Sequence, residues 1–187
     1  MVLFAILASC SHTPPAEIGS YPAANPNDCL PPIALSDQHG TRLTLASLKG
    51  KPVLIDFVYA SCHLECPVLT SKFRLIANAL GSELGNKITL VSITLDPEHD
   101  TPAVLLRYAK AEGAPASGWL FLTGAPAAID QELALFRIKR MREPGGAIGH
   151  VAAAFLLGPD GHQIRQYDAL QVSPKTVVAD IRNALNG

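Results

Sequence analysis

The 187-residue sequence has few aromatic side chains and almost no net charge. Aromatics account for 6% of the residues, and 15 Lys and Arg stand against 16 Asp and Glu. A nucleic-acid-binding face needs an excess of basic side chains to neutralise phosphates, and single-stranded binding also uses aromatic rings for stacking. The chain has neither in quantity, so we expect no nucleic-acid partner.

Cysteine is also scarce. The four cysteines are Cys10, Cys29, Cys62 and Cys66, which is too few for a disulfide scaffold in a chain of this length. Hydrophobic residues make up 48% of the sequence, enough for the core of one domain. Each cysteine therefore needs its own interpretation.

A long hydrophobic run is missing too. The apolar stretch at residues 2–8 is far shorter than the roughly 20 residues that cross a bilayer, but it suits the hydrophobic region of a signal peptide. It ends in "LASC", which resembles a bacterial lipobox with Cys10 as the lipidated residue, although no Lys or Arg precedes it. We expect residues 1–10 to be a lipoprotein-type signal. The alternative is an apolar tail with an incidental cysteine.

A lipid on Cys10 would attach the protein to a membrane in the bacterial cell envelope, on the periplasmic or extracytoplasmic side. Residues 11–32 contain six prolines and cannot bury a core, so they predict a flexible tether. Cys29, near its end, is expected to be a solitary thiol without a function. The folded domain is then expected at residues 33–187.

Within that domain, strand-like and helix-like patterns alternate, and the chain begins and ends its sheet with hairpins. This order predicts an α/β domain with a mixed central sheet flanked by helices. The expected elements are a hairpin at 33–35 and 42–45, a strand at 53–59, a helix at 66–80, a strand at 87–95, a helix at 102–112, a strand at 119–122, a helix at 126–136, a hairpin at 151–157 and 163–167, and a helix at 173–185.

The stretch "YASCHLECPVL", residues 59–69, carries the clearest chemistry. Cys62 is expected in the loop after a buried strand and Cys66 at the start of a helix, where open sheets bind ligands. A helix N-terminus favours the thiolate, which both attacks disulfides and binds metals. A redox pair and a metal site both remain open here, while two unreactive buried thiols are the less favoured alternative.

A metal site needs further donors, although copper(I) favours thiolates and accepts few ligands. His150 follows the glycine-rich "REPGGAIG" and is expected to open a core strand, where a ligand and an ordinary strand-end histidine are equal alternatives. The other histidines are placed in the tether, in hairpin turns, in the second polar loop or between the cysteines: His12, His39, His162, His99 and His63.

Three segments together resemble the Sco/SenC proteins, thioredoxin-fold copper chaperones of cytochrome c oxidase assembly. They are "GKPVLIDFVYASCHLECP", "ITLDPEHDTP" and "GHVAAAFLLGPDG", and the likeness extends over residues 30–186. The resemblance implies a thioredoxin-like fold with an N-terminal β-hairpin. It also implies a copper ion held by Cys62, Cys66 and His150, with Asp96 and Asp100 in supporting roles.

The segment between the cysteines departs from the family pattern. It reads His63-Leu64-Glu65, where the family often has Pro-Asp-Val. His63 could compete as a ligand, and the charge of Glu65 would oppose ionisation of the neighbouring thiols.

The resemblance predicts a copper metallochaperone that delivers copper to the copper-centre subunit of a respiratory cytochrome c oxidase. The alternative is a membrane-anchored thiol–disulfide oxidoreductase, in which Cys62 attacks and Cys66 resolves, keeping the oxidase cysteines reduced. A thioredoxin-like reductant or another copper chaperone would be a further partner. A peroxidase ranks third, because Tyr59 and Ile55 stand where its motif needs Thr or Ser and Pro. An inert surface lipoprotein ranks last.

Overall fold

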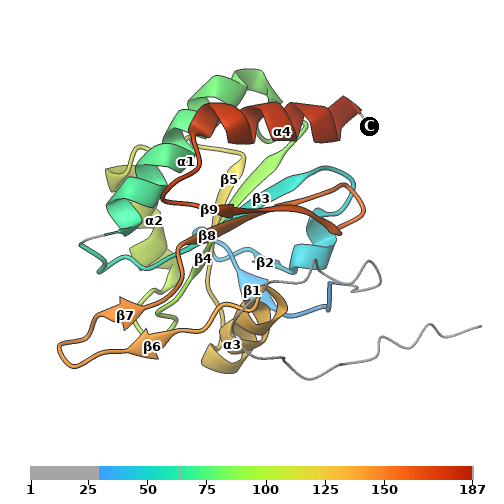
Figure 1. Ribbon diagram of the computed structural model, residues 1–187. Coiled ribbons are helices and arrows are strands. Elements are labelled where there is room, and N and C mark those ends of the chain that lie inside the picture. Colours follow the sequence, from blue (N-terminus) through green and yellow to red (C-terminus); the bar gives the residue numbers. More distant parts are fainter. Residues whose placement is uncertain (1–29, 64, 187) are drawn as a thin grey trace, which may run out of the picture.

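The computed structural model describes residues 30–63 and 65–186, and it contains a five-stranded mixed sheet in the order β5-β4-β3-β8-β9 (Figure 1). The predicted signal, most of the tether, Cys10, His12 and Cys29 lie outside the described residues. The strands of the sheet are β3 (Val53–Val58), β4 (Thr89–Thr94), β5 (Trp119–Leu122), β8 (Ala153–Leu157) and β9 (Gln163–Asp168).

Strand β3 is the centre of this sheet. It runs parallel to β4 and antiparallel to β8, with Ile55 opposite both Val91 and Phe155. Every residue of β3 is buried, because helices or loops cover both faces of the sheet around it. This double burial explains why the sequence of β3 is nearly uniformly apolar rather than alternating.

Helices cover the sheet on both sides. Figure 1 shows α1 (Cys66–Leu80) and α4 (Pro174–Asn186) side by side above the sheet, and α3 (Pro126–Leu135) below it. Helix α2 (Pro102–Ala111) packs on β5, and a 2.7 Å hydrogen bond between the Thr70 and Tyr108 hydroxyls joins it to α1. The predicted α/β architecture is therefore confirmed.

Each face of the sheet has its own aromatic cluster. On one side Trp119 stacks on Phe121 with ring centroids 5.0 Å apart, and Phe73 of α1 lies 5.8 Å from Trp119. A second cluster packs the ring of Phe136 at 5.6 Å from Phe57 and 5.0 Å from Phe155. Tilted and offset ring pairs of this kind add to the stabilisation from burial alone.

The N-terminal hairpin, β1 (Leu35–Ser36) and β2 (Arg42–Leu43), protects an edge of the sheet. The side chain of Gln38, in its turn, donates to the Trp119 carbonyl at 3.0 Å and accepts from the Phe121 amide at 2.9 Å. These bonds occupy backbone groups that the edge strand β5 would otherwise leave open. The predicted hairpin is confirmed, although its strands are shorter than expected.

The structure corrects the sequence prediction around residues 141–152. A small antiparallel pair, β6 (Met141–Arg142) and β7 (Ile148–Gly149), forms there, whereas the sequence analysis expected only a glycine-rich loop. Strand β8 begins at Ala153, so His150 does not open a core strand. The Ala153 amide turns back to the Val151 carbonyl at 3.0 Å, which keeps residues 150–152 out of the sheet.

The described helices also bear on membrane association. Within residues 30–63 and 65–186, none combines the length and apolar character that a membrane crossing requires.

A buried carboxyl group lies in α3, far along the chain from the cysteines. Glu132 is fully buried, and neither carboxyl oxygen has a hydrogen-bond partner in the described part of the chain. Burial raises its pKa from 4.5 to about 8, because the charged form loses its hydration. The folded state therefore holds the proton more tightly than the unfolded state.

We predict that Glu132→Gln stabilises the protein above pH 8 by about 4 kcal/mol. Because the folded pKa is raised, wild-type stability falls as the pH rises from about 4.5 to about 8. The amide cannot ionise, so the difference between variant and wild type should vanish near pH 4. Urea unfolding at pH 4, 6 and 8.5 measures this difference, and a gain that does not depend on pH would contradict the assignment.

Candidate functional site

Three segments meet at one end of the strands, beyond the carboxyl ends of β3 and β4, because of the strand directions. The loop with Cys62 follows β3 and the loop with Asp96 follows the parallel strand β4, so both leave the same edge. Strand β8 runs antiparallel to β3, so the segment that precedes it, with His150, enters at that edge as well. Residues about ninety positions apart in sequence are thus brought to one place.

The two cysteines are linked through the first amide of α1. Cys66 begins this helix, and its backbone N–H donates to the Cys62 sulfur across 3.3 Å. The Cys62 amide in turn donates to the Tyr59 carbonyl at 3.1 Å. Cys62 therefore caps the helix from the preceding loop, rather than sharing a helix face with Cys66. Both residues are thiols in the structure.

The two thiols have unequal surroundings. Cys62 is 8% exposed, whereas Cys66 is completely buried. Burial raises the pKa of the Cys66 thiol well above its usual range, and the hydrogen bond with Cys62 raises it further, against a backbone hydrogen bond from Tyr59. The helix amide favours negative charge on the Cys62 sulfur instead. Cys62 is consequently the thiol placed to react first.

Tyr59 joins the cysteine loop to the segment of His150. Its hydroxyl accepts the Ile148 amide at 3.1 Å, and its ring meets the His150 imidazole edge-on with centroids 6.4 Å apart. Burial raises the pKa of Tyr59, and the nearby thiols add to this against the opposing Ile148 bond, so the hydroxyl keeps its proton.

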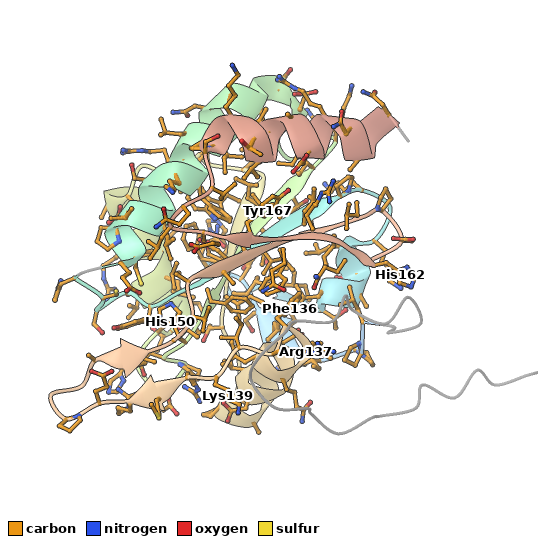
Figure 2. The ribbon with its side chains drawn as sticks, viewed as in Figure 1. Phe136, Arg137, Lys139, His150, His162 and Tyr167 are labelled. Atoms are coloured by element: carbon orange, nitrogen blue, oxygen red, sulfur yellow. The ribbon has the colours of Figure 1, made fainter. Side chains whose placement is uncertain are left out.

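His150 offers one unused nitrogen. Its Nδ1 lies 3.2 Å from the Ile148 carbonyl, and its Nε2 is buried with no hydrogen-bond partner among the described residues. If Nδ1 carries the proton and donates to that carbonyl, Nε2 presents a lone pair. Figure 2 places His150 beside the β6–β7 hairpin, at the opposite side of the molecule from His162.

A polar network ties the same three segments together. Asp100 accepts the Ala60 amide at 3.1 Å and the Thr94 hydroxyl at 2.6 Å, which fixes the start of the cysteine loop. Asp96 accepts from Arg142 of β6 at 2.6 Å and contacts His99 Nδ1 at 2.9 Å. Both aspartates thus contact segments beside the cysteine loop, and their supporting role toward a copper ion stays a prediction.

The two aspartates differ in charge environment. Burial raises the pKa of Asp100, although its bonds from Thr94 and Ala60 act against the shift. Burial would raise the pKa of Asp96 as well, but hydrogen bonds and charge from His99 and Arg142 outweigh it and lower the pKa below its usual range. Asp96 is therefore an anion that can hold the β6–β7 hairpin through Arg142.

The remaining described histidines lie at the surface, and two of them contact aspartates. His99 contacts Asp96, and its side chain is 70% exposed; His162 pairs with Asp160 in the β8–β9 turn. His39 is exposed in the first hairpin, and His63 and Glu65 are exposed beside the buried cysteines. Among residues 30–63 and 65–186, no three His, Cys, Asp or Glu side chains already form a cluster that could hold a metal ion. The two thiols are together, and His150 is linked to them through Tyr59.

Comparison with known proteins identifies the family. The family model described as SCO1/SenC matches residues 22–186, nearly the whole chain. The chain belongs to the SCO1/SenC family. The resemblance inferred from the three sequence segments is thereby confirmed.

Individual SCO1/SenC proteins support this assignment. The SCO1 protein homolog of Bacillus subtilis is 29% identical over 157 residues, which cover 82% of this chain and 81% of that protein. The copper-bound structure of ScoI from Bradyrhizobium japonicum is 30% identical, with a TM-score of 0.74 over 82% of this chain and 98% of that one. Copper-bound yeast Sco1 is 27% identical, with a TM-score of 0.71 over 84% and 88%. The predicted thioredoxin-like fold is confirmed by this likeness.

Two residues of this candidate site were not singled out from the sequence. Arg142 belongs to a loop that carried no pattern, and Tyr59 was considered only as a mismatch to a peroxidase motif. Their contacts depend on the β6–β7 pair, which the sequence did not reveal. The position of Tyr59 one residue beyond the buried strand β3 was the only available signal.

We predict that Cys62 reacts with iodoacetamide at least about tenfold faster than Cys66 in the native reduced protein. Cys62 keeps a small exposed fraction, 8%, and has a helix amide on its sulfur, whereas Cys66 is completely buried and resists ionisation. Peptide mass spectrometry separates these two cysteines from Cys10 and Cys29. Urea-unfolded protein is the control, and there the two cysteines should be labelled at equal rates. Faster labelling of Cys66 than of Cys62 in the native protein would contradict the proposed asymmetry.

Proposed function

We propose that this protein is a copper-binding metallochaperone that acts in cytochrome c oxidase assembly. Family membership supports the role, since ScoI of Bradyrhizobium japonicum and yeast Sco1 are described with copper bound. BsSco, whose sequence is 28% identical, is described as a member of the Sco family of cytochrome c oxidase assembly proteins. The recipient would be the copper-centre subunit of the oxidase.

The unpartnered Nε2 of His150 is the observation that carries the proposal within this chain. A buried imidazole nitrogen without a hydrogen bond is costly unless it binds something. Its other nitrogen faces a backbone carbonyl, the usual way in which a metal-binding histidine is oriented. Two thiolates and one imidazole form a donor set suited to copper. We therefore assign Cys62, Cys66 and His150 as ligands, with copper as the cargo.

Transfer would proceed by exchange of ligands without a change in redox state. Thiolates of the acceptor would replace those of this chain one at a time, and the released sulfurs of Cys62 and Cys66 would take up protons. Cys62, the more exposed of the two thiols, is suited to leave first. Cys66, which is buried and strongly prefers its proton, is suited to leave last and to complete the release.

A second candidate function is thiol–disulfide exchange with the oxidase cysteines. The Cys62 thiolate would attack a partner disulfide, and Cys66 would displace the partner from the mixed disulfide. The partner would gain two electrons and two protons, and this chain would hold a Cys62–Cys66 disulfide. The structure of BsSco is described in terms of a disulfide switch, and the asymmetry of the two thiols favours this order of attack.

The place of action is proposed from the sequence. Cys10 would carry the lipid that attaches the protein to the bacterial envelope on its extracytoplasmic side, and residues 11–32 would tether the domain. A thioredoxin-like reductant or another copper chaperone would return the protein to its reduced or loaded state.

We predict that reduced protein binds about one copper ion per chain, and that His150→Ala weakens binding roughly 100-fold or more. Cys62→Ser and Cys66→Ser should also lose copper, because each removes a thiolate. Anaerobic titration with Cu(I) against a chromophoric chelator measures the affinity, and metal analysis after desalting gives the stoichiometry.

His162→Ala is the matched control, since it removes an exposed histidine from the far side of the molecule. Full copper binding by the His150 and both cysteine variants would refute the assigned site. If His150→Ala lost copper but reduced a model disulfide at the wild-type rate, the redox function would be independent of the metal site.

A further inference from the structure

Tyr59 is a buried side chain whose contacts reach both parts of the proposed site. It follows β3 directly, is 6% exposed, and takes no part as a ligand in the proposed function. Its backbone carbonyl accepts the Cys62 amide, and its hydroxyl accepts the Ile148 amide. Tyr59 lies three positions before Cys62, and Ile148 lies two positions before His150. The contact between them therefore joins the two segments that carry the proposed ligands.

The Ile148 amide depends on this hydroxyl because of the register of β6 and β7. Arg142 faces Ile148, and the next pair outward is closed by a 2.8 Å bond from the Glu143 amide to the Ala147 carbonyl. Hydrogen-bonded and non-hydrogen-bonded pairs alternate in an antiparallel ladder. The Arg142–Ile148 pair is therefore non-hydrogen-bonded, and the Ile148 N–H points away from β6. Ile148 is 5% exposed, so its amide is shielded from water as well as directed away from β6. The Tyr59 oxygen is the acceptor that takes their place.

The contact between the Tyr59 hydroxyl and the Ile148 amide is one tie that holds the β6–β7 hairpin to the rest of the site. The second tie to the hairpin, between Arg142 and Asp96, involves an arginine side chain that is 44% exposed. The arginine end of this pair is open to water, whereas both ends of the Tyr59–Ile148 contact are buried.

We propose that Tyr59 is the positioning residue of this site, holding the segment of His150 against the cysteine loop through its hydroxyl. The inference rests on the proposed copper site, which it deepens. The position of the imidazole relative to the two thiolates sets the coordination geometry, and that geometry sets the energy of the sulfur-to-copper absorption. Tyr59 thereby fixes where the imidazole lies relative to the two thiolates.

Tyr59→Phe tests the proposal because it removes the hydroxyl and keeps the ring that packs on His150. In the metal-free, reduced full chain, hydrogen exchange of the Ile148 amide, followed by NMR, should accelerate about tenfold, since a buried amide loses its acceptor. Tyr167→Phe is the matched control. Its hydroxyl donates to Asp180 at 3.0 Å between β9 and α4, apart from His150 in Figure 2, so Ile148 exchange should not change.

In the copper-loaded protein, Tyr59→Phe should keep the stoichiometry, because all three ligands remain. The sulfur-to-copper absorption band of the Cu(II) form should shift relative to wild type and Tyr167→Phe. The proposal is overturned if exchange at Ile148 is unchanged, if Tyr167→Phe accelerates it equally, or if the band stays at the wild-type energy. If wild type itself bound no copper, the proposed function would fail, while the exchange of Ile148 would still decide whether Tyr59 holds this segment.

Discussion

The antiparallel pairing of β8 with β3 decides where the functional residues of this molecule meet. A parallel strand in that position would have placed His150 at the far end of the sheet, beyond reach of the cysteines. Because β3 and β4 run the same way and β8 runs against them, their functional ends share one edge. The cysteine loop, the loop with Asp96 and Asp100, and the segment of His150 all depend on this arrangement.

At this end of the sheet, a fixed backbone carries two thiols that differ in burial. Strand β3 is buried throughout, and Asp100 binds the backbone just beyond it, so the cysteine loop begins from a fixed point. Helix α1 then directs its first amide to Cys62 and buries Cys66 against the core. This difference suits ordered exchange, whether the thiols hand over a metal ion or electrons, because one sulfur meets the partner and the other completes the step.

Much of the fold followed from the sequence because its signals are local. The helix at Cys66–Leu80 and the strand at Trp119–Leu122 have the bounds that periodicity predicted. The β6–β7 pair was missed because two-residue strands around a glycine-rich turn carry no periodic pattern. His150 was therefore placed at the start of a core strand, whereas it lies in the connection before β8. The roles of Tyr59 and Arg142 could not be predicted without that pair.

The sequence by itself determined the order of elements, the family and the residue types available for chemistry, since these depend on local pattern and on motifs. It left His150 equally acceptable as a ligand or as an ordinary strand-end histidine. Only the tertiary structure decided that its Nε2 is buried without a partner among the described residues and that the Tyr59 hydroxyl accepts the Ile148 amide of its segment. Such facts arise from strand direction and register, which bring together residues about ninety positions apart and which no local pattern encodes.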